Sequence, residues 1–406
     1  MQQAGTRPPG RRSMVTGSRE LIRSMTRSLV LETIINRGPI SRAETAKELG
    51  LTKATVSAIV QDLITRQYVE EVGSGDASMG RKPILLNFCR KNGYVLSADL
   101  QPSGIFLLSC DLGSREGRIY TRREMITRKT IVPLLMEMIQ EAMAEIPSTP
   151  FSVVGITLAI HGTVEDAEIL FAPNYPLAGL PLVRTLSGSL HIPVWLENEA
   201  NLSALAEEYF VRNLPNLIHI NVHTGVGAGI LIDHRPYRGK NGNAGELGHT
   251  TVVPDGRPCP CGNRGCLEQY ISDPAVLSTY EKLSGRQDPT MEELTKGWLA
   301  GEQAAIQTVD GFVRYLALGV HNLGNLFSPD CIVVNSQLTG RLPELISIVR
   351  SCLPPQRHPS FELKASSLKD ASALLGGAYL GISRFLGIEK IFFRDWSLPA
   401  PSVDQT

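Results

Sequence analysis

The sequence predicts an α/β protein in which a helix-turn-helix module precedes a larger body that carries a metal-binding loop. Three observations indicate this fold class. Residues 21–66 contain three helical patterns separated by Gly turns, and the segments after Tyr94 alternate between strand-like and helix-like. Residues 245–268 read GELGHTTVVPDGRPCPCGNRGCLE and combine one His with three Cys. With 406 residues, the chain can form two or three hydrophobic cores.

The composition is that of an ordinary water-soluble protein, with 42% hydrophobic and 20% charged residues. No apolar run is long enough to span a bilayer, and residues 1–20 lack the apolar core of a secretory signal. The seven Cys are an odd number and fit a reducing compartment better than a set of disulfides. We therefore expect a cytoplasmic protein without a membrane partner.

The N-terminal part of the chain is basic, although the whole chain has no net charge. Residues 1–66 carry eleven Lys or Arg and only five Asp or Glu. Such asymmetry is typical of a nucleic-acid-binding end, but basic tails are often only solvated linkers. Residues 1–20 contain two Pro and four Arg without periodicity, and we expect them to form a disordered basic arm.

Residues 21–66 follow the pattern of three short helices. Ser41 and Glu44 form a capping box for the second helix, and Gly50 turns the chain before Thr52 caps the third. The apolar stripe of the third helix is Val56, Ile59, Val60 and Leu63. The first helix stops at Gly38-Pro39, and its apolar stripe is Ile22, Met25, Leu29, Val30 and Ile34. Two short helices joined by a Gly turn are the helix-turn-helix layout.

The third helix is expected to enter the major groove of double-stranded DNA. Its outward residues, which we expect to contact DNA, are Lys53, Ala54, Thr55, Ser57 and Gln61. Residues 68–72 and 84–88 then predict a hairpin wing, with Arg81 and Lys82 at its base to reach a phosphate or the minor groove. The sequence thus predicts a winged helix-turn-helix over residues 21–88. A trihelical docking domain without a DNA partner is the alternative.

The body alternates between β and α patterns. The expected strands are 94–100, 106–112, 151–160, 193–198 and 217–222. The expected helices are 131–146 and 199–212.

The metal-binding loop supplies one imidazole and three thiolates. The ligands are His249, Cys259, Cys261 and Cys266, and the Gly and Pro between them suit a tight turn. One His with three Cys is a ligand set for Zn²⁺. Four protein ligands leave no open position for water, so the Zn²⁺ would be structural. A chance cluster of reduced thiols is the alternative.

Two motifs resemble the ROK family of sugar kinases and transcriptional repressors. One is the GELGH turn followed by CPCGNRGCLE, and the other is RGPISRAETAKELGLTKATVSAIVQDL at residues 37–63. The resemblance covers residues from about 21 to about 386. It implies that residues 92–390 form a two-lobed, actin-like (ribonuclease H-like) ATPase fold with a sugar-binding cleft between the lobes. Residues 391–406 would be a C-terminal tail.

The resemblance also implies a set of sugar-binding residues. His249 would use one ring nitrogen for the metal and the other for the sugar. Carboxylates and amides bind vicinal hydroxyls through paired hydrogen bonds, which suits this set. Its members are Asn174, Asn198, Glu199, Glu246, His249 and Glu268.

The nucleotide-handling elements depart from the family's kinase pattern. Glu199 replaces the Asp that serves as general base in the family's ENDAN segment. The DxGGT phosphate loop has become Asp99-Leu100-Gln101-Pro102-Ser103, and the Gly turn beneath adenosine has become Asn335-Ser336-Gln337. Only residues 224–229 (TGVGAG) keep a phosphate-type loop. We therefore expect no catalytic residue, with Glu199 as a degenerate base position.

Together these features predict a sugar-responsive regulator of carbohydrate metabolism genes, of the repressor type. Its partners would be operator DNA and a sugar effector, and it would form a homodimer or tetramer, because helix-turn-helix proteins usually read twofold-symmetric sites. The main alternative is an active ROK sugar kinase with an attached DNA-binding domain. A third reading is a regulator whose effector is a protein.

Overall fold

The computed structural model describes residues 19–74, 83–172, 175–354, 361–393, 396 and 400–401. The chain forms two compact units, Met1–Cys89 and Arg90–Thr406. No helix in these described ranges is both long and apolar enough to cross a membrane.

The first unit is a three-helix module with a small antiparallel sheet of strand order β1-β3-β2. Ser41 and Glu44 form the predicted capping box of α2, Gly50 ends that helix in the left-handed region, and Thr52 caps α3. The elements are α1 (Arg19–Arg37), β1 (Ile40–Ser41), α2 (Arg42–Leu49), α3 (Lys53–Thr65), β2 (Val69–Ser74) and β3 (Ile84–Phe88). The predicted helices and the hairpin wing are therefore present in this unit.

The apolar stripe predicted for the first helix is only partly buried. Val30 and Ile34 are fully buried, but Ile22, Met25 and Leu29 are 58%, 59% and 48% exposed. The stripe predicted from helical spacing is therefore buried towards the C-terminal half of α1 and exposed towards its start. The four stripe residues of α3 are all buried, as predicted.

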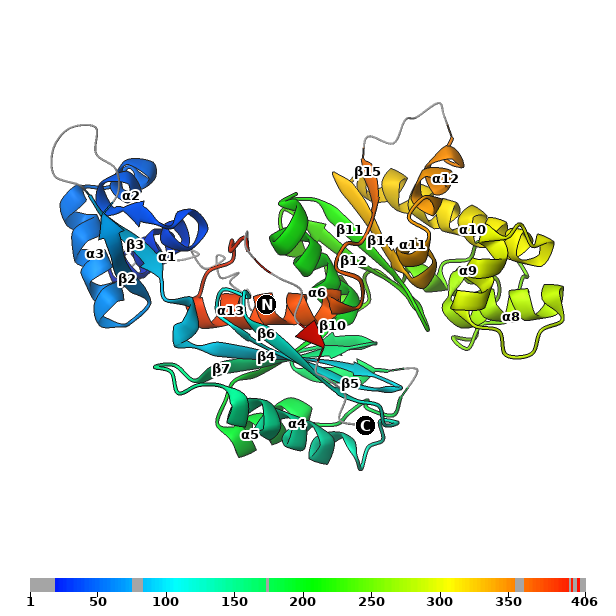
Figure 1. The fold of residues 1–406 in the computed structure, drawn as a ribbon, viewed down its shortest axis with the longest axis horizontal. Coiled ribbons are helices and arrows are strands. Elements are labelled where there is room, and N and C mark those ends of the chain that lie inside the picture. Colours follow the sequence, from blue (N-terminus) through cyan, green and yellow to red (C-terminus); the bar gives the residue numbers. More distant parts are fainter. Residues whose placement is uncertain are drawn as a thin grey trace, which may run out of the picture. The chain divides into compact units, whose positions relative to one another are not determined.

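The second unit begins with a six-stranded sheet of order β10-β7-β4-β5-β6-β16, which forms the first lobe (Figure 1). Strands β10, β7 and β4 run parallel to one another, whereas β4, β5 and β6 form an antiparallel meander. The strands are β4 (Tyr94–Gln101), β5 (Gly104–Asp111), β6 (Gly117–Arg122), β7 (Val153–Ile160), β10 (Val194–Asn198) and β16 (Ala400–Pro401). Helices α4 (Ile131–Glu145) and α5 (Leu182–Leu190) share one hydrophobic core with these strands.

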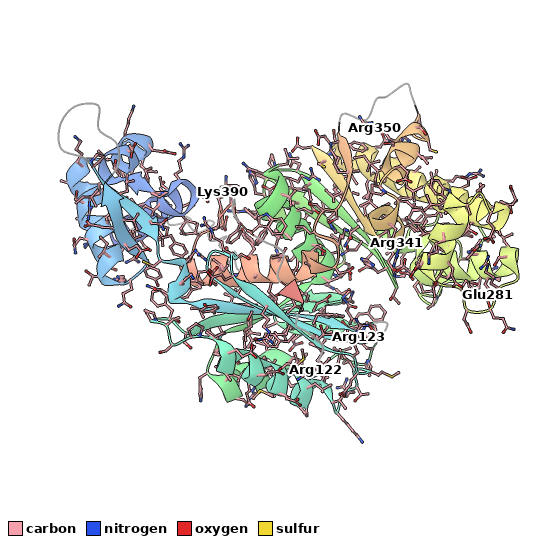
Figure 2. All side chains as sticks on the ribbon, in the orientation of Figure 1. Arg122, Arg123, Glu281, Arg341, Arg350 and Lys390 are labelled. Atoms are coloured by element: carbon pink, nitrogen blue, oxygen red, sulfur yellow. The ribbon has the colours of Figure 1, made fainter. Side chains whose placement is uncertain are left out.

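Helix α4 is also linked to β6 of this sheet by charge pairs. Arg122, the last residue of β6 and labelled in Figure 2, lies 2.5 Å from Glu141, and Arg118 lies 2.6 Å from Glu145. A small two-stranded sheet, β8 (Thr163–Glu165) with β9 (Glu168–Phe171), follows β7.

The second lobe is built on a five-stranded sheet of order β13-β12-β11-β14-β15. Its strands are β11 (Leu217–Val222), β12 (Val226–Ile232), β13 (Arg235–Pro236), β14 (Cys331–Ser336) and β15 (Glu362–Ala365). The helices of this lobe pack with the sheet around a separate core. They are α7 (Glu268–Ile271), α8 (Asp273–Ser284), α9 (Met291–Leu299), α10 (Gln303–Phe327), α11 (Gln337–Arg341) and α12 (Leu345–Ser351).

Two helices connect the lobes. Helix α13 (Ser372–Leu386) lies on β4 and β7 of the first sheet, α6 (Glu199–Ala206) lies on β11 and β12 of the second, and the two helices pack against each other (Figure 1). Small residues permit this approach: a Cβ on Gly376 would lie 1.8 Å from the Leu202 carbonyl oxygen. The helix predicted over 199–212 is α-helical only to Ala206 and continues as a π-helical turn over Glu207–Arg212.

Candidate functional site

Polar side chains gather where three neighbouring parallel strands end. Asp99 lies near the end of β4, His161 follows β7, and Asn198 and Glu199 stand at the junction of β10 and α6. Because Leu100 and Asn198 both pair with Ile160, these three strand ends lie at one edge of the first sheet. The carboxyl ends of parallel strands are the usual place for a ligand in an α/β fold.

His161 stands between two carboxylates. Its Nε2 lies 2.8 Å from Oδ1 of Asp99, and its Nδ1 lies 4.0 Å from Oε1 of Glu199. The other oxygen of Asp99 accepts a hydrogen bond from Nε2 of Gln101 at 2.8 Å. The backbone N–H of His161 donates to the Tyr175 hydroxyl at 2.9 Å. Asp99 is almost fully buried, whereas the His161 side chain is 26% exposed.

The two carboxylates hold a proton on His161. Burial alone would lower the pKa of His161, but the charges of Asp99 and Glu199 and the hydrogen bond to Asp99 raise it to about 9. Burial would likewise raise the pKa of Asp99, but the His161 charge and hydrogen bond outweigh burial, and the pKa falls below its usual range. At neutral pH the pair is therefore an imidazolium and a carboxylate, and both ring nitrogens of His161 are donors.

Asn198 organises the start of α6. Its side-chain oxygen accepts from the backbone N–H groups of Ala200 and Asn201 at 2.9 and 3.1 Å, which makes it the N-cap of the helix. Its Nδ2 donates to the Gly162 carbonyl oxygen at 3.0 Å. The neighbouring Glu199 comes within reach of β12, because a Cβ on Gly227 would lie 3.8 Å from its Oε1.

The second lobe contributes two further carboxylates and an imidazole. Oε2 of Glu268 accepts from the backbone N–H of Val226 at 3.0 Å. Oε2 of Glu246 lies 3.9 Å from Nε2 of His249. Burial raises the pKa of Glu246, the charge of His249 lowers it, and the charges of Glu199 and Glu268 raise it again. Glu246 therefore lies within electrostatic reach of carboxylates from both lobes.

The structure brings five of the six residues expected to bind sugar to this region: Asn198, Glu199, Glu246, His249 and Glu268. Asn174 lies outside the described residues. His161 was not among the predicted site residues, although the sequence carries one signal for it. His161 is the first polar residue after the strand GITLAI, at the position where a buried parallel strand delivers a side chain to the edge of the sheet.

The predicted metal ligands converge. The ligand atoms of His249, Cys259, Cys261 and Cys266 all lie within 4.8 Å of one another. His249 Nδ1 is 3.6 Å from Cys259 Sγ, and the Sγ atoms of Cys261 and Cys266 are 3.7 Å apart. A tetrahedral ion with bonds of about 2.3 Å to sulfur and about 2.0 Å to nitrogen requires separations of roughly 3.6 Å and 3.8 Å. This cluster can therefore hold a metal ion.

Glycines shape the metal loop. Gly265 has φ +75° and lies so close to the backbone of Val253 that a Cβ on Gly265 would be 1.7 Å from the Val253 carbonyl oxygen. Two isolated bridges, Thr251 with Cys266 and Pro258 with Arg264, close the loop. Because His249 Nδ1 faces the thiols and Nε2 faces Glu246, the loop connects the metal cluster to the polar site.

The altered nucleotide loops are filled by their own side chains. Pro102 and Ser103 form a tight turn between β4 and β5, and Gln101 bonds back to Asp99. In the second lobe, Asn335 donates to the side-chain oxygen of Asn221 at 3.0 Å, and Ser336 caps α11. These polar groups thus make hydrogen bonds within the protein.

The surviving phosphate-type loop, residues 224–229, is the hairpin that joins β11 to β12. Its last glycine has a packing role: a Cβ on Gly229 would lie 2.0 Å from the Ala200 carbonyl oxygen. The N–H of Val226 donates to Oε2 of Glu268.

In the first unit, the residues expected to contact DNA from α3 form one exposed face: Lys53, Ala54, Thr55, Ser57 and Gln61. Thr55 also supports the cap, because its hydroxyl lies 2.8 Å from that of Thr52. Arg81 and Lys82 lie outside the described residues.

Comparison with known proteins finds matches in both units. The ROK family profile matches residues 105–384, and the MarR family profile matches residues 24–77. The chain is 32% identical to the xylose repressor of Bacillus spizizenii over 384 residues, which covers 91% of this chain and 98% of that protein.

Two solved structures are similar as well. A ROK family transcriptional regulator described as a homologue of the Escherichia coli MLC protein has a TM-score of 0.76 and 26% identity, covering 91% of this chain and 98% of that one. A ROK family glucokinase from Streptomyces griseus, in complex with glucose and AMPPNP, has a TM-score of 0.63 and 26% identity. It covers 71% of this chain and 99% of the glucokinase.

Proposed function

The chain belongs to the ROK family, and we propose that it is a sugar-responsive repressor that binds operator DNA through residues 21–88 and a sugar through residues 92–390. The observation that carries the proposal is the combination of a helix-turn-helix with an exposed recognition face and a ROK body that keeps its sugar side. The relative from Bacillus spizizenii is named xylose repressor, which makes a pentose the first effector to test.

We propose that the body no longer transfers phosphate. Pro102 has no N–H to offer a phosphate, and Gln101, Asn335 and Ser336 are engaged in internal hydrogen bonds. Glu199 retains a carboxylate at the base position, and its Oε1 lies 4.0 Å from Nδ1 of the His161 ring. The carboxylates of Glu199, Glu246 and Glu268 can bind the hydroxyls of a sugar. Without a nucleotide site beside them, they suit a protein that senses the sugar.

The metal in the His249 cluster would be Zn²⁺, because one imidazole with three thiolates is the ligand set of a closed structural zinc site. Zn²⁺ there would fix the loop that carries Glu246 and His249, and would leave no position for an activated water. The chain's own residues then orient the sugar: the carboxylates accept from its hydroxyls, and the backbone N–H of Val226 holds Glu268 in place.

Regulation would follow from linkage between two ligands. If the sugar favours one arrangement of the lobes and the operator favours another, each ligand weakens the other's binding by the same factor. A twofold operator would be read by a homodimer, or by a tetramer built from two such dimers.

The test is a titration-calorimetry and thermal-shift panel on the zinc-loaded chain. D-xylose, D-glucose, N-acetylglucosamine and glucose 6-phosphate would each be added with and without Mg-ATP. We expect one sugar to bind and Mg-ATP to give no shift. Phosphate transfer would establish the sugar kinase instead, and a failure of every sugar would favour a protein effector.

A further inference from the structure

His161 is a polar residue of the site that does not belong to the expected sugar-binding set. It does not belong to the metal cluster, and Nε2 is already committed to Asp99. Its Nδ1 has no hydrogen-bond partner among the described residues, yet the side chain is 26% exposed at the edge of the sheet where the parallel strands end. A donor presented in this way is available to a ligand.

The separation of 4.0 Å between Nδ1 and Oε1 of Glu199 is too long for a direct hydrogen bond. It matches the space that a single bridging hydroxyl needs. If a hydroxyl oxygen lay about 2.8 Å from both atoms, the Nδ1–O–Oε1 angle at that oxygen would be roughly 90°. This value is close to the angle between the donor and acceptor directions of an alcohol. The hydroxyl would accept from His161 and donate to Glu199.

The surroundings select the charge of that ligand. The carboxylate of Glu246 lies within electrostatic reach of those of Glu199 and Glu268, and the His161 imidazolium is balanced by Asp99. Arg238 is already bonded to Glu197 through two nitrogens. A sugar phosphate or a sugar acid would be repelled here, whereas the hydroxyls of an uncharged sugar can donate to each carboxylate.

We infer that His161 and Glu199 together clamp one hydroxyl of an uncharged, unphosphorylated sugar, and that Asp99 positions His161 for this contact. The inference rests on the proposed sugar-sensing function and names the class of its effector. The raised pKa of His161 supports it, because the protonated ring offers Nδ1 as a donor at neutral pH. Glu199 is one methylene longer than the Asp that the family's kinases have at this position. Its Oε1 lies 4.0 Å from Nδ1 of the ring, which leaves space for one hydroxyl between them.

The test is a cycle between the His161 side chain and the hydroxyls of the sugar. Titration calorimetry would measure the affinity of the best sugar of the panel and of each of its monodeoxy analogues, for the unmodified chain and for His161→Ala. A hydrogen bond to a charged group supports about a 10- to 100-fold difference in affinity. We expect His161→Ala to bind the parent sugar that much more weakly, and the penalty for removing one particular hydroxyl to disappear in the variant.

The controls keep the outcomes apart. His161→Gln preserves most of the side-chain volume and one donor, and it replaces His161→Ala if the latter does not fold. His321→Gln changes a histidine on α10 and should leave sugar affinity unchanged. If no sugar binds the unmodified chain, the proposed function fails. If a sugar binds, but every deoxy penalty is the same with and without His161, the clamp is wrong and the proposed function stands. Tighter binding of glucose 6-phosphate than of the free sugars would also overturn the inference.

The positioning role of Asp99 has a separate readout. The titratable groups facing His161 are Asp99 from β4, Glu199 from α6 and Tyr175 from the loop before α5, with His223 near Asp99. In Asp99→Asn the main charge that keeps His161 protonated is lost. Sugar affinity should then fall between pH 6.5 and 8, whereas the unmodified chain holds its affinity until about pH 9. Parallel pH profiles for both chains would contradict the role of Asp99.

Discussion

Arg238 places two guanidinium nitrogens on one oxygen of the Glu197 carboxylate, with Nε at 3.0 Å and Nη2 at 2.5 Å. Glu197 lies on β10 of the first sheet, and Arg238 follows β13 of the second, so the pair joins the two lobes beside the polar site. The other oxygen of Glu197 accepts from Nδ2 of Asn201 at 3.0 Å. Each oxygen of the buried Glu197 carboxylate therefore accepts a hydrogen bond from a side chain.

Replacing Arg238 with Met should destabilise the second unit. Glu197 is only 4% exposed, and removing one partner of a buried pair leaves an uncompensated charge. Because the Arg238 side chain is 42% exposed, water can replace part of the interaction, and we expect a loss of about 1–3 kcal/mol in the free energy of unfolding. Denaturant unfolding measures it.

A second variant and a control sharpen this result. Glu197→Gln combined with Arg238→Met removes the buried charge and should recover part of the loss. Arg235→Met breaks an exposed pair with Glu389, and we expect a change below about 0.5 kcal/mol. Equal effects of the Arg235 and Arg238 changes would show that the interlobe pair contributes no more than a surface contact.

The metal cluster predicts one bound Zn²⁺ per chain. Cys266 is fully buried and its Sγ lies 3.7 Å from that of Cys261, so Cys266→Ser should abolish stoichiometric zinc and lower the melting temperature. Metal analysis by mass spectrometry and thermal unfolding are the measurements. Cys352→Ser alters an exposed Cys outside the cluster and serves as the control. Full zinc content in Cys266→Ser would refute the four-ligand site.

The exposed face of α3 predicts how DNA affinity responds to salt. We expect Lys53, at the start of the helix, to neutralise a phosphate, so Lys53→Ala should weaken operator binding and reduce the slope of log affinity against log salt by about one. Fluorescence anisotropy at several salt concentrations measures both. Lys282→Ala, on α8 of the second unit, should change neither. An unchanged slope in Lys53→Ala would remove this residue from the interface.

Local signals in the sequence were enough to predict the first unit. The Ser41–Glu44 capping box, the left-handed Gly50 and the Thr52 cap each act within four residues, so they can be recognised without knowledge of the fold. The burial of α1 depends on which neighbours cover it. Helical periodicity therefore could not tell that Val30 is buried while Met25 is exposed.

In the candidate site, too, features set by residues close along the chain could be predicted, whereas features set by the fold could not. The His249 cluster could be predicted because its cysteines are close along the chain and carry a recognisable chemistry. His161 could not be predicted as the partner of Asp99, because 62 residues separate them and only the pairing of β4 with β7 brings them together. Likewise, the glycines of 224–229 suggested a phosphate loop, but Gly229 is required by the close approach of α6.

His219 of β11 predicts an acid-sensitive stability. The residue is fully buried, and neither ring nitrogen has a hydrogen-bond partner in the described part of the chain. Burial, and then the charge of His223, lower its pKa to about 3. Below about pH 6.5 the imidazole of His219 binds a proton in the unfolded chain but stays neutral in the folded chain. The contribution of His219 to the free energy of unfolding is therefore complete above about pH 6.5 and is lost as the pH falls towards 3.

We therefore expect His219→Leu to flatten the acid limb of the stability curve. The slope of unfolding free energy against pH should differ from that of the unmodified chain by up to about 1.4 kcal/mol per pH unit between pH 6 and 4. Denaturant unfolding at each pH measures it, and any loss of bound metal in acid affects both chains and cancels in the difference. His321→Leu, on α10, is the control. Parallel curves for His219→Leu and the unmodified chain would mean that His219 takes up its proton without unfolding, because water or a rearranged partner reaches the ring.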